Sequence, residues 1–248
     1  MFEFSMGLNV LTGMTRQHTH THTHTHTGTK KGGWGGILKQ NIQGTYVQQM
    51  RCASCGFEKQ REPENFQYRF VNVDGLNTLQ EGLADMVKWD QLEGYRCDKC
   101  SSRGTTSKRE IPNFLSDSLF FCLKRFDWDW NTGERTKLNS RFEFPHDLDM
   151  RPFVQVDKKD KIEDERAYFE FELSGVIVHL GGPASGHYYS YAKSDDEDGE
   201  WYELNDSMTT SFDSEKIKEE CFGGTLFLIV TLSFIHSNTN IRTPTLEH

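Results

Sequence analysis

The sequence predicts an α+β fold built around a mainly antiparallel sheet, and three observations support this class. Apolar, aromatic and β-branched residues recur in short runs bounded by turn residues, which is typical of strands. One stretch alone combines helical spacing of apolar residues with a strong capping motif. Many strands with few helices, rather than a strict strand–helix alternation, indicate α+β and not a parallel α/β sheet.

The first predicted elements are two strands and a helix. Residues 44–51 (GTYVQQMR) are predicted as a strand that leads to the first CxxC pair. Residues 66–73 (FQYRFVNV) are predicted as a second strand, because they alternate and are rich in aromatic and β-branched residues. Thr78 and Glu81 have the spacing of a capping box, in which each side chain bonds the other residue's backbone N–H. Residues 79–88 are therefore predicted as a short amphipathic helix, with apolar residues at helical spacing: Leu79, Leu83 and Met86.

The second half of the chain is predicted to be mostly strands. Residues 119–127 (LFFCLKRFD) are strongly apolar, so we place them in the centre of the sheet. A turn at 131–133 precedes a strand at 141–144 that ends at Pro145. The later elements are strands at 169–180, 187–193 and 200–204, a glycine-containing loop at 181–186, an acidic hairpin tip at 194–200 and a small helix at 212–220.

Composition divides the chain into three parts. Residues 1–36 are predicted to be a low-complexity leader, because their His-Thr repeat offers no apolar face and a glycine-rich stretch follows. Residues 37–235 are predicted to be the folded part, and an aromatic content of 12% is enough for a packed core. Residues 236–248 are predicted to be a loose tail.

Charge and hydropathy exclude several classes of partner. The chain has 28 basic and 37 acidic residues and a net charge of −9, which disfavours a general grip on nucleic-acid phosphates. The apolar run 226–235 is too short to span a bilayer, and the N-terminus lacks the features of a signal peptide. We expect no nucleic-acid or membrane partner and a cytoplasmic protein, with the nucleus as a second compartment.

Four of the six cysteines form two CxxC pairs, Cys52 with Cys55 and Cys97 with Cys100. Each CxxC turn aims two thiolates at one point, and four thiolates make a tetrahedral zinc site. An even number of cysteines is also compatible with disulfides, and a CxxC motif can be redox-active, although thioredoxin-type motifs use one pair at the start of a helix. We predict a structural zinc, because protein ligands would fill all four positions.

His187 is the candidate catalytic histidine. It follows a loop whose glycines let the backbone approach a ligand closely. A hairpin turn centred at 196–197 would pair His187 with Asp206 and leave Asn205 one step away, whereas a turn at 198–199 would shift this register. An imidazole beside a carboxamide or carboxylate is the orienting arrangement of a Cys-His-Asn/Asp site.

Several motifs in one order resemble the ubiquitin-specific protease family. The strings GHYYSY at 186–191 and WYELND at 201–206 resemble the family's histidine box. The two CxxC pairs fall where the fingers of this family carry zinc ligands. Further matching strings are LKRF at 123–126, EFP at 143–145, LDM at 148–150 and CFGG at 221–224. The resemblance runs from about residue 37 to residue 224.

The resemblance implies a papain-like cysteine protease that cleaves the bond after ubiquitin's C-terminal glycine. In that scheme His187 is the general base toward a cysteine thiol, Asn205 orients the imidazole, and Asp206 assists or substitutes. The family also implies fingers at about 45–110, which carry the zinc and bind the globular body of ubiquitin, and a palm at about 111–235. The implied partners are ubiquitin and ubiquitinated proteins. Two loops would border the channel for the ubiquitin tail: 158–166 and 181–186.

The chain departs from the family pattern at the nucleophile. The family's cysteine box and helical thumb are not found, and the cysteines outside the pairs are Cys122, within an apolar strand, and Cys221. We therefore expect a partial domain whose thumb is largely missing, and no peptidase activity from this chain alone. The alternatives are a non-catalytic ubiquitin-binding zinc module and a zinc-ribbon protein unrelated to ubiquitin; ubiquitin binding and labelling by a thiol-reactive ubiquitin probe distinguish them.

Overall fold

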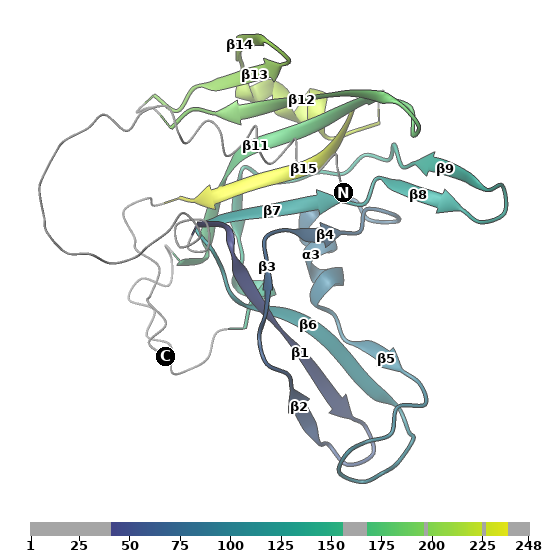
Figure 1. The fold of residues 1–248 in the computed structure, drawn as a ribbon. Coiled ribbons are helices and arrows are strands. Elements are labelled where there is room, and N and C mark those ends of the chain that lie inside the picture. Colours follow the sequence, from purple (N-terminus) through teal and green to yellow (C-terminus); the bar gives the residue numbers. More distant parts are fainter. Residues whose placement is uncertain (1–40, 156–167, 196–197, 225–226, 238–248) are drawn as a thin grey trace, which may run out of the picture.

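The computed structural model describes residues 41–155, 168–195, 198–224 and 227–237. It contains two larger sheets, of five and eight strands, with helix α3 between them (Figure 1). The five-stranded sheet is named the fingers below, and the eight-stranded sheet the palm. This architecture confirms the predicted α+β class. The predicted leader at 1–36 and the charged loop at 158–166 lie outside the described residues.

The fingers have the strand order β2-β1-β6-β5, and β3 also pairs with β1. All of these pairs are antiparallel. The strands are β1 (Gly44–Cys52), β2 (Glu58–Gln60), β3 (Glu64–Phe66), β5 (Asp90–Leu92) and β6 (Thr106–Phe114). Their buried apolar side chains are Val47, Met50, Cys52, Ile111 and Pro112, so this sheet carries only a thin apolar layer.

Helix α3 (Leu79–Val87) has the predicted capping box. The hydroxyl of Thr78 accepts a hydrogen bond from the backbone N–H of Glu81 at 3.2 Å, and the Glu81 carboxylate accepts one from the Thr78 N–H at 3.3 Å. Leu79 and Leu83 are fully buried on the inner face of the helix. The amphipathic helix predicted from the spacing is therefore confirmed.

The palm has the strand order β14-β13-β12-β11-β15-β7-β4, and β10 also pairs with β11. Its pairs are antiparallel except the parallel pair of β4 and β7. The strands are β4 (Arg69–Val71), β7 (Ser118–Leu123), β10 (Asp147–Asp149), β11 (Glu170–Gly181), β12 (Gly186–Lys193), β13 (Trp201–Asn205), β14 (Met208–Phe212) and β15 (Phe227–His236).

One continuous apolar core covers a face of the palm. Buried side chains from β7, β11 and β15 meet side chains from α3 and from the segment before β10. Aromatic edge-to-face contacts join Phe121 to Phe234, with ring centroids 6.0 Å apart, and Phe144 to Phe222, at 4.9 Å. This core contains most of the buried apolar side chains of the described residues.

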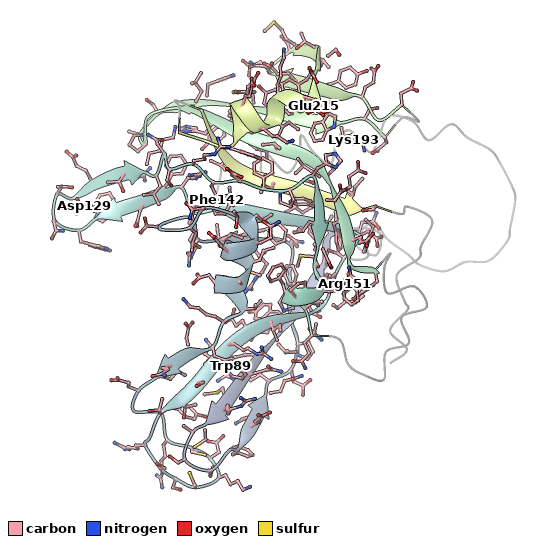
Figure 2. All side chains as sticks on the ribbon, turned by 180° about the vertical axis from the view of Figure 1, so that it is seen from behind. Trp89, Asp129, Phe142, Arg151, Lys193 and Glu215 are labelled. Carbon is pink, nitrogen blue, oxygen red and sulfur yellow. The ribbon has the colours of Figure 1, made fainter. Side chains whose placement is uncertain are left out.

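The remaining elements are short. Strands β8 (Phe126–Asp129) and β9 (Glu134–Lys137) form a hairpin that projects beyond the palm (Figure 1), with Asp129 toward its far end (Figure 2). Its turn is the one predicted at 131–133, where Gly133 has a φ of 71°. Two 3₁₀ turns, η1 (Arg151–Phe153) and η2 (Ser214–Lys216), and helix α5 (Ile217–Cys221) complete the described chain.

Three predicted strand assignments were wrong in detail. The segment 141–144 is not a strand, because the N–H of Phe142 bonds the carbonyl of Phe222 and the N–H of Glu143 bonds that of Asn77. Strand β7 lies near one edge of the palm, with only the three residues of β4 beyond it. The predicted strand at 66–73 is divided: Phe66 ends β3 in the fingers, and β4 belongs to the palm.

Candidate active site and metal centre

The four cysteines of the CxxC pairs meet at the tip of the fingers. The Sγ atoms of Cys52 and Cys100 are 3.8 Å apart, as are those of Cys55 and Cys97. All four sulfurs lie within 4.8 Å of one another. A tetrahedral zinc–thiolate site with Zn–S bonds of about 2.3 Å has edges of about 3.8 Å. The cluster therefore fits a zinc ion with four protein ligands.

The two cysteine loops have the same backbone design. The N–H of Gly56 bonds the carbonyl of Cys52, and the N–H of Ser101 bonds that of Cys97, both at 2.9 Å. Gly56 and Ser101 have φ values of 66° and 56°, in the left-handed region that lets the chain turn sharply after each pair. Two equivalent loops facing each other place four sulfurs at one point.

The thiols of Cys52 and Cys55 differ in their pKa values. The backbone N–H of Cys55 is the largest influence on Cys52 and lowers the pKa of that thiol to about 6. For Cys55 the N–H of Phe57 lowers the pKa, but burial and the neighbouring thiols outweigh it and raise the pKa to about 12. A metal ion that binds here would displace the remaining thiol protons, since thiolates are the ligands.

His187 and Asn205 are in direct contact. His187 is the second residue of β12, and its Nε2 lies 2.6 Å from Oδ1 of Asn205, the last residue of β13. Because a carboxamide oxygen only accepts, this contact assigns the ring proton to Nε2. Nδ1 then keeps its lone pair and forms no hydrogen bond within the described residues, so it is available as a base.

A carboxylate orients the asparagine in turn. The Asn205 amide nitrogen donates to Oε1 of Glu203 at 3.2 Å, which points the amide oxygen toward His187. Sequence reasoning missed Glu203. The signal was available, because residues two apart on a strand share a face and Glu203 lies two residues before Asn205 in β13.

The predicted pairing of His187 with Asp206 was wrong. In the structure Ser190 pairs with Leu204, one residue further along than a turn centred at 196–197 would give. Asp206 lies in the turn after β13, where it is exposed and has a φ of 53°.

The backbone around His187 is tightly constrained. A Cβ atom on Gly186 would lie 2.2 Å from Nε2 of His179, so only glycine fits at the start of β12. Gly186 pairs with Gly181 at the end of β11, and the Lys137 ammonium group from β9 donates to the carbonyl of Gly181 at 2.5 Å. Burial lowers the pKa of Lys137. This contact connects the β8–β9 hairpin to the loop before His187.

The two other cysteines are buried, Cys122 in β7 of the palm and Cys221 at the end of α5. Desolvation raises the pKa of Cys122 to about 12, and burial with the nearby charge of Glu220 raises the pKa of Cys221 well above its usual range. Both thiols are therefore neutral near pH 7, whereas a cysteine nucleophile must ionise. All six cysteines of the chain lie in its described part, and none is both exposed and outside the CxxC pairs.

Known proteins are similar to this chain in sequence and in fold. The family model for ubiquitin carboxyl-terminal hydrolase matches residues 10–231. The chain belongs to this hydrolase family. Human ubiquitin carboxyl-terminal hydrolase 9Y is 33% identical over 216 residues, which cover 76% of this chain and 8% of that protein. Human ubiquitin carboxyl-terminal hydrolase 24 is 33% identical over 223 residues, 79% of this chain and again 8% of the relative. The chain therefore spans less than a tenth of the length of these relatives.

Solved structures of the family have the same fold. One is the SAGA Ubp8/Sgf11/Sus1/Sgf73 DUB module bound to ubiquitin aldehyde, at 26% identity and a TM-score of 0.69. The match covers 82% of this chain and 43% of that chain. The family fold predicted from the sequence motifs is thus confirmed. Within the described ranges, no helix has both the length and the apolar character needed to cross a membrane.

Proposed function

We propose that this chain supplies the general base and its orienting amide to a thiol-dependent hydrolase that cleaves after ubiquitin's C-terminal glycine. The contact of 2.6 Å between His187 Nε2 and Asn205 Oδ1 is the observation that carries the proposal. Family membership and the ubiquitin aldehyde in the related DUB module support ubiquitin and ubiquitinated proteins as the partners. Six free cysteines support a reducing compartment, the cytoplasm or nucleus.

The chemistry follows from the tautomer. Nε2–H is held by Asn205, so Nδ1 accepts the proton of a cysteine thiol, and the thiolate attacks the carbonyl carbon of the scissile bond. The imidazolium then returns the proton to the leaving amine, and water hydrolyses the thioester. Asn205 stabilises the ring orientation throughout, as the third member of such sites does.

Asp206 and the zinc have supporting roles in this proposal. Asp206 follows Asn205 directly, and in this proposal its carboxylate assists Asn205 or substitutes for it. Zinc bound by Cys52, Cys55, Cys97 and Cys100 is structural, because no ligand position is left for water or substrate. The fingers that it holds together would contact the globular body of ubiquitin.

The pure chain should not cleave ubiquitin substrates. Cys122 and Cys221 are buried and neutral, and the other four thiols serve the metal site. We expect no release of fluorophore from a ubiquitin C-terminal fluorogenic substrate and no labelling by a thiol-reactive ubiquitin probe, together with ubiquitin binding in a calorimeter. Cleavage by the pure chain would refute the inactive assignment.

The orienting role of Asn205 can be tested without turnover. In ¹⁵N NMR spectra, His187 of the wild-type chain should be mainly the Nε2–H tautomer, and Asn205→Ala should shift it toward a mixture of tautomers. Asn131→Ala, in the β8–β9 turn, removes the same group elsewhere and should leave the His187 signals unchanged. Equal tautomer populations in wild type and Asn205→Ala would eliminate the orienting role.

The second candidate function is a non-catalytic ubiquitin-binding zinc module, and the buried state of Cys122 and Cys221 favours it. A polypeptide that joins this chain to an upstream cysteine-bearing segment of a relative separates the two functions. The hydrolase proposal expects cleavage that His187→Ala abolishes. A joined polypeptide that binds ubiquitin, carries a reactive thiol and still cleaves nothing would establish the non-catalytic module.

A further inference from the structure

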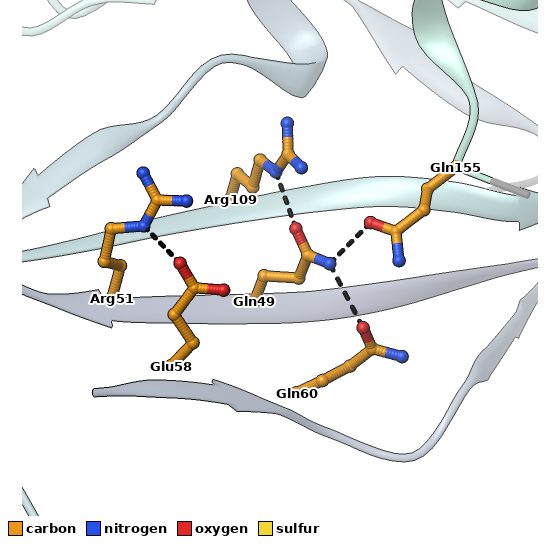
Figure 3. Close-up of polar contacts among 6 residues, drawn as sticks. All are labelled: Gln49, Arg51, Glu58, Gln60, Arg109 and Gln155. Carbon is orange, nitrogen blue, oxygen red and sulfur yellow. Dashed lines mark hydrogen bonds and ion pairs between the residues drawn. The ribbon is translucent and has the colours of Figure 1, made fainter. Parts of the chain in front are cut away.

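One face of the fingers belongs to neither the cysteine cluster nor the His187 site. Side chains alternate between the two faces of a sheet, so Gln49 and Arg51 of β1 share one face. Their neighbours across the sheet share it too, because Gln49 pairs with Arg109 of β6 and with Gln60 of β2. Figure 3 shows these side chains together, with Gln155 reaching them from the segment after η1.

Two arginines of this face stack on one tryptophan. The guanidinium carbon of Arg109 lies 4.6 Å from the ring centroid of Trp89, and that of Arg51 lies 5.1 Å from it. Trp89 directly precedes β5, the strand that pairs with β6. Stacking on an indole holds a guanidinium group in place without neutralising it. The two guanidinium groups are therefore fixed on the same patch of the sheet.

The two arginines differ in their polar partners. Arg51 donates from Nε to the Glu58 carboxylate at 2.7 Å, whereas Arg109 donates from Nε to the neutral amide oxygen of Gln49, also at 2.7 Å (Figure 3). Within the described ranges, no carboxylate lies at ion-pair distance from Arg109. Burial and then the charge of Arg51 lower the pKa of Arg109, and the charge of Glu58 raises it, so a bound anion would further offset the lowering.

Glutamine side chains border the arginines. The Gln49 amide nitrogen donates to Oε1 of Gln155 at 2.6 Å and to Oε1 of Gln60 at 3.1 Å. These contacts use only the acceptor ends of Gln60 and Gln155. Their NH₂ groups form no hydrogen bond within the part of the chain that the structure describes, so they remain as donors near the two arginines (Figure 3).

We propose that this face binds an acidic segment of a partner protein, with a carboxylate on Arg109 and Arg51 and peptide carbonyls on Gln60 and Gln155. A guanidinium group matches the planar geometry of a carboxylate. The arginines and glutamines are spread over β1, β2, β6 and the segment after η1, which suits an extended peptide better than a single small anion. The chain as a whole carries a charge of −9, so a polyanion would be repelled unless it met a local positive site. The site does not depend on hydrolysis.

Fluorescence anisotropy with the full 248-residue chain tests the proposal. The probe is a labelled twelve-residue peptide of alternating glutamate and glycine at low salt, compared with its glutamine counterpart. We expect Arg109→Gln to weaken binding of the glutamate peptide at least about tenfold, and Arg51→Gln and Trp89→Leu to weaken it less. Lys108→Gln is the matched control: it removes the same charge from the opposite face of β6 and should change affinity less than about twofold.

Three outcomes would overturn the proposal. Equal losses of affinity in Arg109→Gln and Lys108→Gln would show that the peptide is attracted by the general positive charge of the sheet and not by this face. Equal affinity for the glutamine peptide would show that binding does not need a carboxylate. Displacement by inorganic phosphate at matched ionic strength would identify a simple anion site instead. Zinc content and circular dichroism confirm that each variant is folded. Should Arg109→Gln misfold, Arg51→Gln with the same control decides the question.

Discussion

The fingers and the palm reach stability by different routes. The palm sheet packs against a core in which side chains such as Phe171, Leu232 and Phe234 are completely buried. The fingers are two-sided and exposed, and their strands β2, β3 and β5 carry almost no buried side chain. In place of a core they have the cysteine cluster at the tip. Small units that cannot bury enough apolar surface commonly need a metal or disulfides.

The comparison implies that different substitutions should unfold the two sheets. Removal of a metal ligand should unfold the fingers and leave the palm, whereas a cavity in the core should weaken the palm and leave the metal bound. Helix α3 contacts both β6 of the fingers and β4 of the palm, so changes there should affect both sheets slightly. The following predictions test this division, beginning with the largest expected effect.

Cys97→Ser should abolish zinc binding and unfold the fingers. Structural zinc in small domains contributes apparent free energies of about 10–16 kcal/mol, so its loss exceeds what the thin apolar layer of this sheet can offset. Zinc content should fall from one ion per chain to none, and hydrogen exchange of amides in β1 and β6 should become fast. Cys122→Ala, in the palm, should keep the zinc. Retained protection of β1 in Cys97→Ser would show that the fingers fold without metal.

Phe171→Ala should destabilise the palm while leaving zinc bound. Its ring is fully buried and stacks on His236 with centroids 4.1 Å apart. Truncation of a buried phenylalanine costs about 3–5 kcal/mol, to be measured by urea unfolding. Trp130→Ala removes a larger side chain that is 88% exposed, and it should change stability by less than about 0.5 kcal/mol. Similar effects of the two variants would contradict the location of the core.

Thr78→Ala should have a moderate effect on both sheets. It removes the hydroxyl that caps α3, which costs about 1 kcal/mol and should lower Tm by about 3 °C. Thr78→Ser keeps the capping oxygen and should behave as wild type. A loss of the same size in Thr78→Ser would mean that the methyl group, and not the cap, stabilises this junction.

Asp149→Asn should have the smallest effect, and one that depends on pH. Hydrogen bonding to Arg151, which donates to both carboxylate oxygens at 2.9 Å, holds the pKa of Asp149 below its usual value. Stabilisation from a lowered carboxyl pKa is present above the unfolded value of about 3.9 and is lost as pH falls through the folded value. The pair is largely exposed, so we expect about 0–1 kcal/mol.

Thermal melts of wild type and Asp149→Asn at matched pH values measure this difference. It should be constant from pH 7 to about pH 5 and vanish toward pH 2. Asp147→Asn removes the same charge from the same strand without disturbing Arg151 and serves as the control. A difference that grows on acidification would reverse the sign of the linkage and reject the ion pair.

Local signals predicted much of the fold and of the candidate site. The capping box of Thr78 and Glu81 depends only on neighbouring residues and was read correctly. The cysteine pairs were also readable, since each loop is built locally. The long strands β11 and β12 followed from continuous apolar or aromatic runs. These features need no knowledge of distant partners.

Features fixed by distant contacts were missed or misplaced. Strand β6 has a polar sequence and contains Pro112, and it is a strand because it pairs along its length with β1. The segment 141–144 has the sequence pattern of a strand, but its backbone N–H groups form hydrogen bonds with residues outside the strands. The register at His187 was off by one, because a loop's sequence does not reveal where its turn lies. Lys137 offered no sequence signal, since its contact with Gly181 is purely tertiary.

The position of β15 has a consequence for biosynthesis. This strand is the last described element of the chain, yet it lies between β11 and β7 in the middle of the palm. A nascent chain can complete the fingers once residue 114 has left the ribosome, whereas the palm must wait for residues up to 236. Until then β11 and β7 have open apolar edges, which are templates for wrong pairing. The half of the molecule that carries His187 is thus the half whose sheet stays incomplete longest during translation.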